Sequence, residues 1–182
     1  MDPTNSAVTN FIGNIMVDAV REQPGLDGVQ LDDHFAWPTS IAGSNVAAMT
    51  NAAQQVRAIF RSASSAYLSL APNPLSTSIS KYNVDWKTWA NMGLFSEYAP
   101  QLYTASYSTF ASELSTTLSD IPSTVHKYML AGIRCNGSGN PTSWSELDNM
   151  IDDTQNNSLG VAIWYGDCIL DIYPTNFPPG PW

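Results

Sequence analysis

The sequence predicts an α/β protein with a parallel sheet, because strand-like and helix-like segments alternate along the chain. The helix-like segments carry apolar residues at the i, i+3, i+4 spacing of helices that cover a sheet. The strand-like segments are short apolar runs bounded by Gly, Pro and Asn. No glycine fingerprint of the dinucleotide-binding or P-loop type follows a strand, which leaves a nucleotide-binding open sheet with little support.

The first expected helix covers residues 4–23, with Thr4 or Asp2 at its start and Pro24-Gly25 at its end. Its apolar residues share one stripe, which we expect to face the sheet. That stripe consists of Val8, Phe11, Ile12, Ile15, Met16, Ala19 and Val20.

The remaining elements follow in strict alternation. Strands are expected at 27–33, 66–71, 95–103, 127–134 and 159–165, and helices at 44–62, 84–92, 107–119 and 144–156. Gly93 stands at the C′ position after the helix 84–92. Ser143 and Glu146 form a capping-box pattern at the start of the helix 144–156. Residues 37–43 and 72–82 are expected to be loops.

Five strands limit the architecture. A closed (β/α)8 barrel needs eight strands and typically about 250 residues, whereas this chain has 182. The chain is therefore either a small open sheet or the latter part of a barrel whose first strands are absent. We expect one domain over residues 1–170, followed by an irregular Pro-rich tail over 171–182.

Charge and hydropathy exclude several classes of partner. The net charge of −9 argues against nucleic acid or an anionic membrane as a partner. No apolar run is long enough to span a bilayer, and no signal peptide opens the chain. Met1 is followed at once by Asp2-Pro3-Thr4-Asn5, which is more typical of a helix start than of a protein start. Six Trp and eight Tyr suit either a core or the binding of sugar faces.

The strand 27–33 runs directly into two carboxylates and a histidine. Because side chains alternate along a strand, Val29 and Leu31 should pack against helices while Gln30 and Asp32 share the opposite face. In a barrel that face is the interior, and active sites lie at the C-terminal ends of the strands. We therefore take Asp32 as the first candidate catalytic residue. A helix cap or a partner for a basic neighbour is the alternative, and it suits Asp33 better.

Asp33 has the opposite parity and should face the helix layer or the rim, in a supporting role that orients the following loop. His34 joins the two aspartates as a further polar candidate. A metal site formed by these three residues is the minority interpretation, because metal sites usually need more ligands and His126 lies at the far end of its strand. We expect no metal and no cofactor.

Other candidates for sugar binding lie where strands end. Asn73, Gln101 and Tyr103 can hydrogen-bond hydroxyl groups, although Gln101 is nearly as well explained as a satisfied polar group of the barrel interior. Trp37, Trp164 and Tyr165 stand at the same rim, and alternation allows only one of the last two to point inward. The substrate-binding candidates are thus Gln30, His34, Trp37, Asn73, Gln101, Tyr103, Trp164 and Tyr165.

Each of three other features has both a structural and a functional interpretation. Trp86 and Trp89, three residues apart on a short helix, favour packing. Lys81 could meet Asp32 or a substrate group, or be a solvated surface lysine. Cys135 and Cys168 follow neighbouring strands, which permits a disulfide but also two free thiols.

Several segments together resemble the glycosyl-hydrolase-like family 10 proteins in order and spacing. They are Asp2-Pro3-Thr4-Asn5, Leu26-Asp27-Gly28-Val29-Gln30-Leu31-Asp32-Asp33-His34-Phe35, Leu68-Ser69-Leu70-Ala71-Pro72-Asn73-Pro74, Asp85-Trp86-Lys87-Thr88-Trp89, Pro100-Gln101-Leu102-Tyr103 and Ile163-Trp164-Tyr165. The resemblance implies a bacterial (β/α)8 barrel, secreted or attached to the cell envelope, that cleaves glycosidic bonds. It also implies that the five strands are the fourth to eighth of the barrel. A truncated reading frame would explain the missing first three strands, and a half-barrel that assembles with a partner chain is the alternative.

Glycoside hydrolysis usually needs two carboxyl groups, and the second is not evident. Glu97 lies near the start of its strand, where residues serve stability, and Asp167 is a weak candidate just beyond the last strand. A partner acid on the absent strands is the remaining choice.

We therefore expect a glycoside hydrolase acting on a polysaccharide or cell-envelope glycan, incomplete as this chain, with Asp32 and Asp33 as its catalytic candidates. The rivals are a non-catalytic carbohydrate-binding remnant, an inactive fragment that self-associates through its exposed sheet edge, and a metal-dependent hydrolase.

Overall fold

The computed structural model describes residues 2–137 and 139–177. Its strands are β1 (Gly28–Leu31), β2 (Tyr67–Leu70), β3 (Glu97–Tyr98), β4 (Gln101–Leu102), β5 (Leu130–Arg134) and β6 (Gly160–Trp164). Its helices are α1 (Ser6–Glu22), α2 (Thr39–Ala42), α3 (Val46–Ala63), α4 (Leu75–Tyr82), α5 (Trp86–Asn91), α6 (Tyr107–Asp120), α7 (Ser123–His126), α8 (Trp144–Asn156) and the short π-helical turn η1 (Cys168–Ile172).

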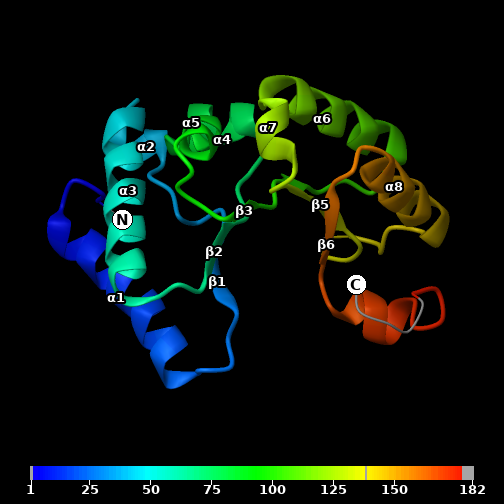
Figure 1. The fold of residues 1–182 in the computed structure, drawn as a ribbon. Coiled ribbons are helices and arrows are strands. Elements are labelled where there is room, and N and C mark those ends of the chain that lie inside the picture. The colour runs from blue at the N-terminus through cyan, green and yellow to red at the C-terminus, as the bar shows by residue number, and fades with distance from the viewer. Residues whose placement is uncertain (1, 138, 178–182) are drawn as a thin grey trace.

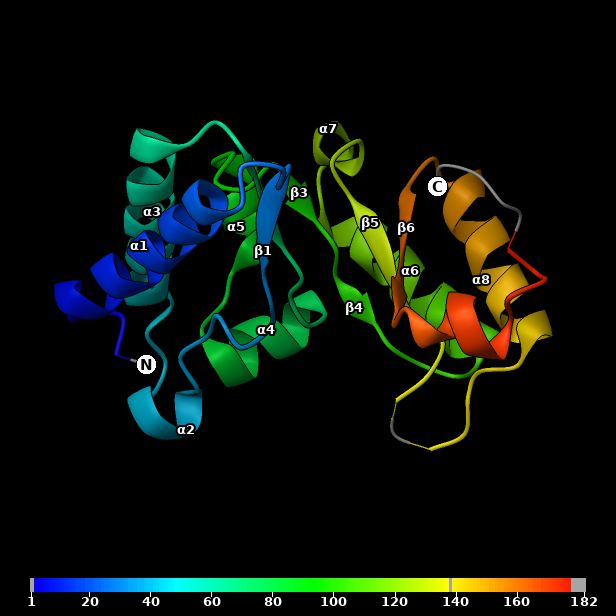
Figure 2. The same ribbon diagram turned by 90° about the horizontal axis from the view of Figure 1, so that it is seen from below.

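The strands lie in sequence order and are all parallel, as predicted. β1, β2 and β3 form one ladder, β4, β5 and β6 form a second, and a bridge between Tyr98 and Met129 joins the two. The long helices arch around the outer side of the strands (Figures 1 and 2). This arrangement confirms the α/β class and the curved sheet of a partial barrel, with β1 and β6 outermost.

The predicted strand 95–103 is divided into β3 and β4. Pro100 separates the two pieces, and it has no backbone N–H to donate to a ladder. The Pro100 carbonyl instead accepts from the N–H of Leu102 at 3.0 Å and of Gly132 at 2.9 Å. A Cβ atom at position 132 would lie 2.7 Å from the Pro100 oxygen, so this close approach requires glycine.

The predicted buried stripe of α1 is wrong in part. Phe11 and Ile15 are 65% and 51% exposed, whereas Gly13 and Met16 are buried. α1 packs against α3 through its smaller residues, and an added Cβ at Gly13 would meet the Ile59 side chain at 2.7 Å. The close approach of the two helices at Gly13 therefore goes with a rotation of α1 in which Phe11 and Ile15 face outward while Met16 faces the core.

The start of α1 also differs from the expectation. The Asn5 side chain accepts from the N–H of Ala7 at 3.0 Å and is the N-cap. Asp2 accepts from the N–H and hydroxyl of Thr4 in the turn before the helix. Neither Asp2 nor Thr4 caps the helix itself.

Both predicted loops contain helices. α2 lies within residues 37–43 and α4 within 72–82. Asn83 holds these segments together because its buried amide donates to the carbonyls of Trp37 and Gly43 and accepts from the N–H of Asn45. Its left-handed backbone, with φ of 59°, ends α4.

The expected capping box of α8 is not formed. The Glu146 carboxylate accepts from the backbone N–H of Tyr107, at the start of α6, rather than from its own N-cap. The Ser143 hydroxyl lies 3.2 Å from that of Ser145 and makes no cap hydrogen bond. Glu146 thus connects two helices instead of closing one.

The aromatic core confirms the packing interpretation of the short helix α5. Trp86 and Trp89 are fully buried, and they stack on Tyr98 and Phe95 with ring centroids 6.2 and 6.0 Å apart. Gly93 follows α5 with φ of 63°, which confirms it as a C′ glycine. The core therefore lies between the sheet and the outer helices.

The end of the chain is less irregular than predicted. Within the expected tail 171–182, the Tyr173 hydroxyl donates to the Thr142 carbonyl, and Tyr173 and Phe177 contact the Trp144 ring. These contacts hold the segment after η1 against the start of α8. Residues 178–182 lie outside the described part of the chain.

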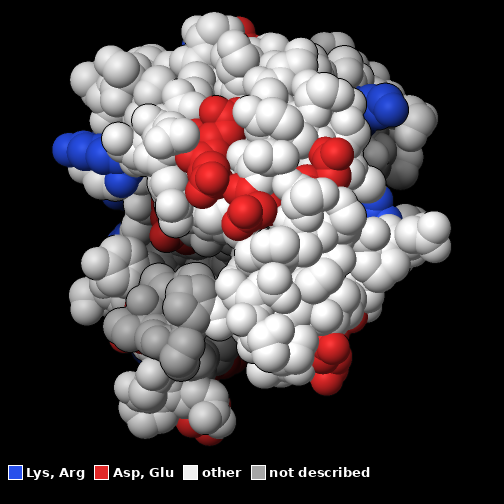
Figure 3. Space-filling view, turned by 90° about the vertical axis from the view of Figure 1, so that its right-hand side faces the viewer, with Lys and Arg blue, Asp and Glu red and all other residues white. Residues whose placement is uncertain are grey.

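Acidic side chains gather on the side of the molecule that carries α8 (Figure 3). α8 contains Glu146, Asp148, Asp152 and Asp153 and no Lys or Arg. This side therefore has little positive charge with which to attract a polyanion, and the absence of a nucleic-acid partner stays a prediction. Within the described residues, the helices are all too short or too polar to cross a membrane.

Candidate active site

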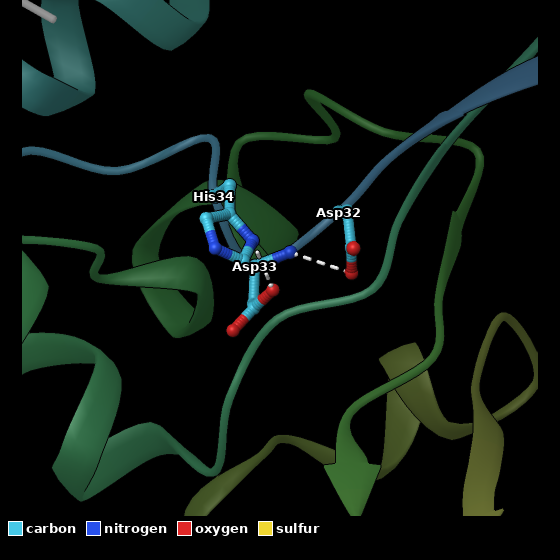
Figure 4. Close-up of side chains that lie close together, drawn as sticks. All are labelled: Asp32, Asp33 and His34. Carbon is cyan, nitrogen blue, oxygen red and sulfur yellow. Dashed lines mark hydrogen bonds and ion pairs between the residues drawn. The ribbon is translucent and has the colours of Figure 1, made fainter. Parts of the chain in front are cut away.

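Asp32 lies directly after β1, at the C-terminal end of the strands. Val29 and Leu31 pack against the core, while Gln30 and Asp32 face away from it, as strand alternation predicts. The Asp32 carboxylate accepts from the N–H of Asp33 at 2.8 Å and from the Gln101 side chain at 2.7 Å (Figure 4 shows the first bond).

Gln101 connects the strands beneath this carboxylate. Its amide nitrogen also donates to the carbonyl of Ala71, just after β2, at 3.0 Å. One side chain from β4 thus bridges the ends of β1 and β2 and holds Asp32 in place. The location at the C-terminal ends of parallel strands is the one where barrel enzymes carry their active sites.

Asp33 lies in the same cleft as Asp32, contrary to the parity argument. β1 ends at Leu31, so Asp33 belongs to the following turn, where strand alternation no longer applies. Its carboxylate accepts from the Asn73 side chain at 3.0 Å and lies 2.9 Å from Nδ1 of His34. Asn73, just after β2, therefore positions Asp33.

Asp32, Asp33 and His34 offer three ligand atoms within 4.8 Å of one another. The His34 side chain is 92% exposed, and its ring lies beside the Asp33 carboxylate (Figure 4). Exposed acidic groups commonly make such a set without an ion. The geometry therefore adds no support for a metal site at these three residues.

The cleft at these residues has a volume of about 260 Å³. It is lined by Asp32, Asp33, His34, Gln101, Tyr103 and Trp164. The Tyr103 and Trp164 rings stack with centroids 6.2 Å apart and an interplanar angle of 27°. Trp164 remains 48% exposed, so it presents ring surface to a ligand. Carboxylates, an amide and an aromatic face are the groups that bind the hydroxyls and apolar faces of sugars.

The Tyr103 hydroxyl is held in its neutral form. Burial, and then the nearby charges of Asp32 and Asp33, together raise the pKa of Tyr103 to about 12. Tyr103 can therefore donate a hydrogen bond over the whole physiological pH range.

Four predicted candidates lie away from the cleft lining. Gln30 donates to the Ser69 hydroxyl deeper between the strands, and Asn73 acts through Asp33. The Trp37 side chain packs against the core, and the backbone N–H of Trp37 donates to the Tyr82 carbonyl. Tyr165 is exposed beside Trp164, with ring centroids 5.5 Å apart. Trp164 alone of this pair lines the cleft, and Tyr165 lies beyond the end of β6.

The cleft contains no further carboxylate among the described residues. Glu97 lies at the start of its strand and accepts from Ser69, which joins it to Gln30. Asp167 accepts from the Asn136 side chain at 2.8 Å. Ser69 was missed as part of this polar chain, although a serine between Leu68 and Leu70 signals a polar position inside the sheet.

The two cysteines form a disulfide. Cys135 and Cys168 have Cα atoms 5.9 Å apart and are both fully buried. The bond joins the residue after β5 to η1, and the N–H of Cys135 donates to the Trp164 carbonyl at 2.8 Å. It therefore stabilises the rim of the cleft on the Trp164 side.

Lys81 and His126 take no part in the cleft. Lys81 is an exposed residue at the end of α4. His126 lies at the opposite end of the strands, where Nε2 is 3.0 Å from the Ile121 carbonyl oxygen.

Comparisons with known proteins identify the fold. No protein family model matches the chain, and no curated protein matches it. A solved structure of the catalytic domain of Thermobifida fusca endoglucanase Cel5A (E5) superposes with a TM-score of 0.54 at 13% identity, covering 92% of this chain and 54% of that one. The fold is a partial (β/α)8 barrel.

The chain spans about half the length of the solved structure it matches. Because the identity is low, the likeness concerns the fold alone. The resemblance to glycosyl-hydrolase-like family 10 is not confirmed by these comparisons.

Proposed function

We propose that this chain carries part of the active site of a glycoside hydrolase that acts on a polysaccharide or cell-envelope glycan. The observation that carries the proposal is Asp32 at the C-terminal end of a partial barrel, in one cleft with Gln101, Tyr103 and Trp164. The structural neighbour, an endoglucanase catalytic domain, supports the same class of activity.

In this proposal Asp32 is the catalytic carboxylate. The Tyr103 hydroxyl and the hydrogen-bonding groups of Gln101 that Asp32 and Ala71 do not use bind sugar hydroxyls, and Trp164 stacks on a sugar ring. The ligand atoms of Asp32 and Asp33 lie within 4.8 Å. Glycosidase carboxyl pairs are usually about 5–5.5 Å apart when retaining and about 6.5–9.5 Å when inverting. Asp33 therefore serves mainly to position the turn, and the second acid comes from outside this cleft lining.

In this proposal, strands that this chain does not supply lie between β1 and β6 in the complete barrel. The two strands are paired on one side only in the described sheet, and a closed barrel has eight strands. Three strand–helix units, from another part of the same polypeptide or from a partner chain, would close the barrel and bring the second acid. The buried disulfide favours an exported protein, secreted or in the cell envelope.

The first step of the test is the genomic sequence upstream of Met1, read for an in-frame extension. The longest product is then assayed on soluble polysaccharides and cell-wall glycans by release of reducing ends. Asp32→Asn should lower kcat/KM by roughly 10²-fold or more, the typical contribution of an acid–base group. Asp18→Asn, on the exposed surface of α1, is the matched control and should leave it unchanged. Full activity of Asp32→Asn would refute the proposed role.

A non-catalytic carbohydrate-binding domain is the second candidate. It is favoured because Asp32 and Asp33, which are adjacent in sequence, are the only carboxylates that line the cleft among the described residues, so no second acid faces Asp32 across it. In that case the protein binds glycans without turnover, Trp164→Ala weakens binding, and Asp32→Asn leaves the bond-cleaving rate at zero as in the parent. Titration of oligosaccharides by calorimetry separates this outcome from an inactive fragment, which binds none.

A further inference from the structure

A second and larger cavity lies at the other end of the strands, away from Asp32. Its volume is about 730 Å³. Its walls come from α3, from the segment around α7, and from the residues where β3, β5 and β6 begin. Figure 2 shows α7 at the end of the sheet from which β5 starts. The proposed glycan cleft uses none of these residues.

Positive charge is concentrated in this cavity. The whole chain has seven Lys and Arg residues, and Arg57, Arg61 and Lys127 all line this one space. In a protein of net charge −9, such a grouping marks the place where an anion would be attracted. Glu97 also lines the cavity, and its carboxylate accepts from Ser69 at 3.0 Å.

Two of the three cations already have contacts. The Arg61 guanidinium donates to the Ala66 carbonyl at 2.6 Å and to the Ser96 hydroxyl at 2.8 Å. The Lys127 ammonium lies 4.7 Å from the centre of the Tyr128 ring. Both side chains are therefore held at the cavity wall and contribute charge there.

Arg57 and Tyr98 are different, because each has a buried polar group at the cavity that is incompletely satisfied. Nε of Arg57 has no hydrogen-bond partner among the described residues, and the Tyr98 hydroxyl has a contact with the Phe95 backbone but no described acceptor for its proton. Tyr98 is only 1% exposed, and both residues line the same cavity. Burial raises the pKa of Tyr98, while the Phe95 backbone and then the Arg57 charge act in the opposite direction, so Tyr98 and Arg57 lie within electrostatic reach of each other.

Leaving such groups unpaired is costly. A buried donor without an acceptor destabilises the folded state, and the cost is greater when the donor is charged. Both the Arg57 Nε–H and the neutral Tyr98 O–H are donors, and a group with several acceptor oxygens satisfies them together. We infer that this cavity binds a small molecule through a phosphate- or sulfate-type oxyanion, held by Arg57 and Tyr98 with added charge from Arg61 and Lys127.

The inference is tested by thermal unfolding and calorimetry with inorganic phosphate, sulfate and glucose 6-phosphate in the low millimolar range. Sodium chloride keeps the ionic strength constant, and glucose is the uncharged control. The oxyanions should raise Tm in a saturable way, since a ligand that binds only the folded state stabilises it. A greater effect of glucose 6-phosphate would assign the cavity to a phosphorylated small molecule, and an equal effect to the free ion.

Two variants make the test specific. Arg57→Gln and Tyr98→Phe should each weaken binding by at least about tenfold, the value of one charge-assisted hydrogen bond. Arg21→Gln, an exposed position on α1, is the matched control and should bind as the parent does.

Circular dichroism shows whether Arg57→Gln is folded. If that variant is unfolded, anion binding by Tyr98→Phe tests the inference in its place. Equal Tm increases in the parent and both variants would indicate a general salt effect and overturn the inference. No increase with any oxyanion would also overturn it, and would assign the cavity to polypeptide that packs at this end of the barrel.

Discussion

At the residue scale, the candidate site depends on side chains that contact other side chains across strands. Gln101 reaches Asp32 from β4, and Asn73 reaches Asp33 from the end of β2. Both amides are neutral donors, so they orient the carboxylates without neutralising them. The result is a pair of charged groups at fixed positions beside an aromatic face.

Tyr103 is expected to ionise at unusually high pH. Its pKa is raised to about 12 by burial and then by Asp32 and Asp33, whereas an exposed tyrosine ionises near pH 10. The folded state therefore holds this proton more tightly than the unfolded state. The contribution of this pKa difference to the free energy of unfolding is fully present below about pH 10 and is lost as the pH rises through about 12. The absorbance of tyrosinate during alkaline titration measures this ionisation.

Comparison of the parent with Tyr103→Phe assigns the ionisation to this residue. Asp32→Asn and Asp33→Asn should each lower the pKa of Tyr103, because each variant removes a negative charge that opposes formation of the tyrosinate anion. If Tyr103→Phe instead removed a phenol that titrates near pH 10, the described burial of Tyr103 would be wrong.

At the scale of elements, the disulfide joins parts that are distant in sequence. It links the end of β5 to η1 across a separation of 33 residues. The segments it joins flank Trp164, whose carbonyl accepts from Cys135. The position of the aromatic rim therefore depends on a covalent bond as well as on packing.

Loss of this disulfide should destabilise the protein. Cys135→Ala/Cys168→Ala is expected to lower the free energy of unfolding by about 3–4 kcal/mol, from the entropy of a closed loop of this length. Denaturant unfolding of the double variant gives the value, and the parent unfolded with a reducing agent is the matched comparison. A reducing agent should have no effect on the double variant. Equal stability of the oxidised parent and the double variant would contradict the bond's role.

At the scale of the whole molecule, the sheet has two outer strands. β1 and β6 each have one neighbour in the described sheet, and α1 exposes Phe11 and Ile15 on its outer side. Unpaired strand edges and exposed apolar stripes favour association with further polypeptide. The molecule as described therefore offers surfaces that a complete barrel would cover.

The 182-residue chain alone is expected to self-associate as its concentration rises. Sedimentation velocity over a wide concentration range measures this, and Phe11→Ser/Ile15→Ser should shift the equilibrium toward monomer if the α1 stripe contributes. Addition of polypeptide that supplies the remaining strand–helix units should suppress self-association. A monomer at every concentration would show that the outer strands are already protected.

The order of strands and helices could be predicted from sequence because it depends on local patterns. Alternation placed Val29 and Leu31 in the core and Gln30 and Asp32 opposite them, and Gly93 ended its helix because a left-handed backbone favours glycine. Asp32 could be found for the same reason, as the first carboxylate after a strand of alternating pattern.

Other features depended on partners that no local pattern reveals. Glu146 contacts Tyr107 instead of its own helix start, and Gly13 allows α3 to approach so closely that Phe11 turns outward. Asp33 enters the cleft because its strand ends one residue before Asp32, and Asn73 then holds it. Periodicities and turns are properties of neighbouring residues, so the amino-acid order is enough to predict them. Which distant side chains meet depends on the folded arrangement, because hydrogen bonds and close packing act between surfaces that the fold brings together.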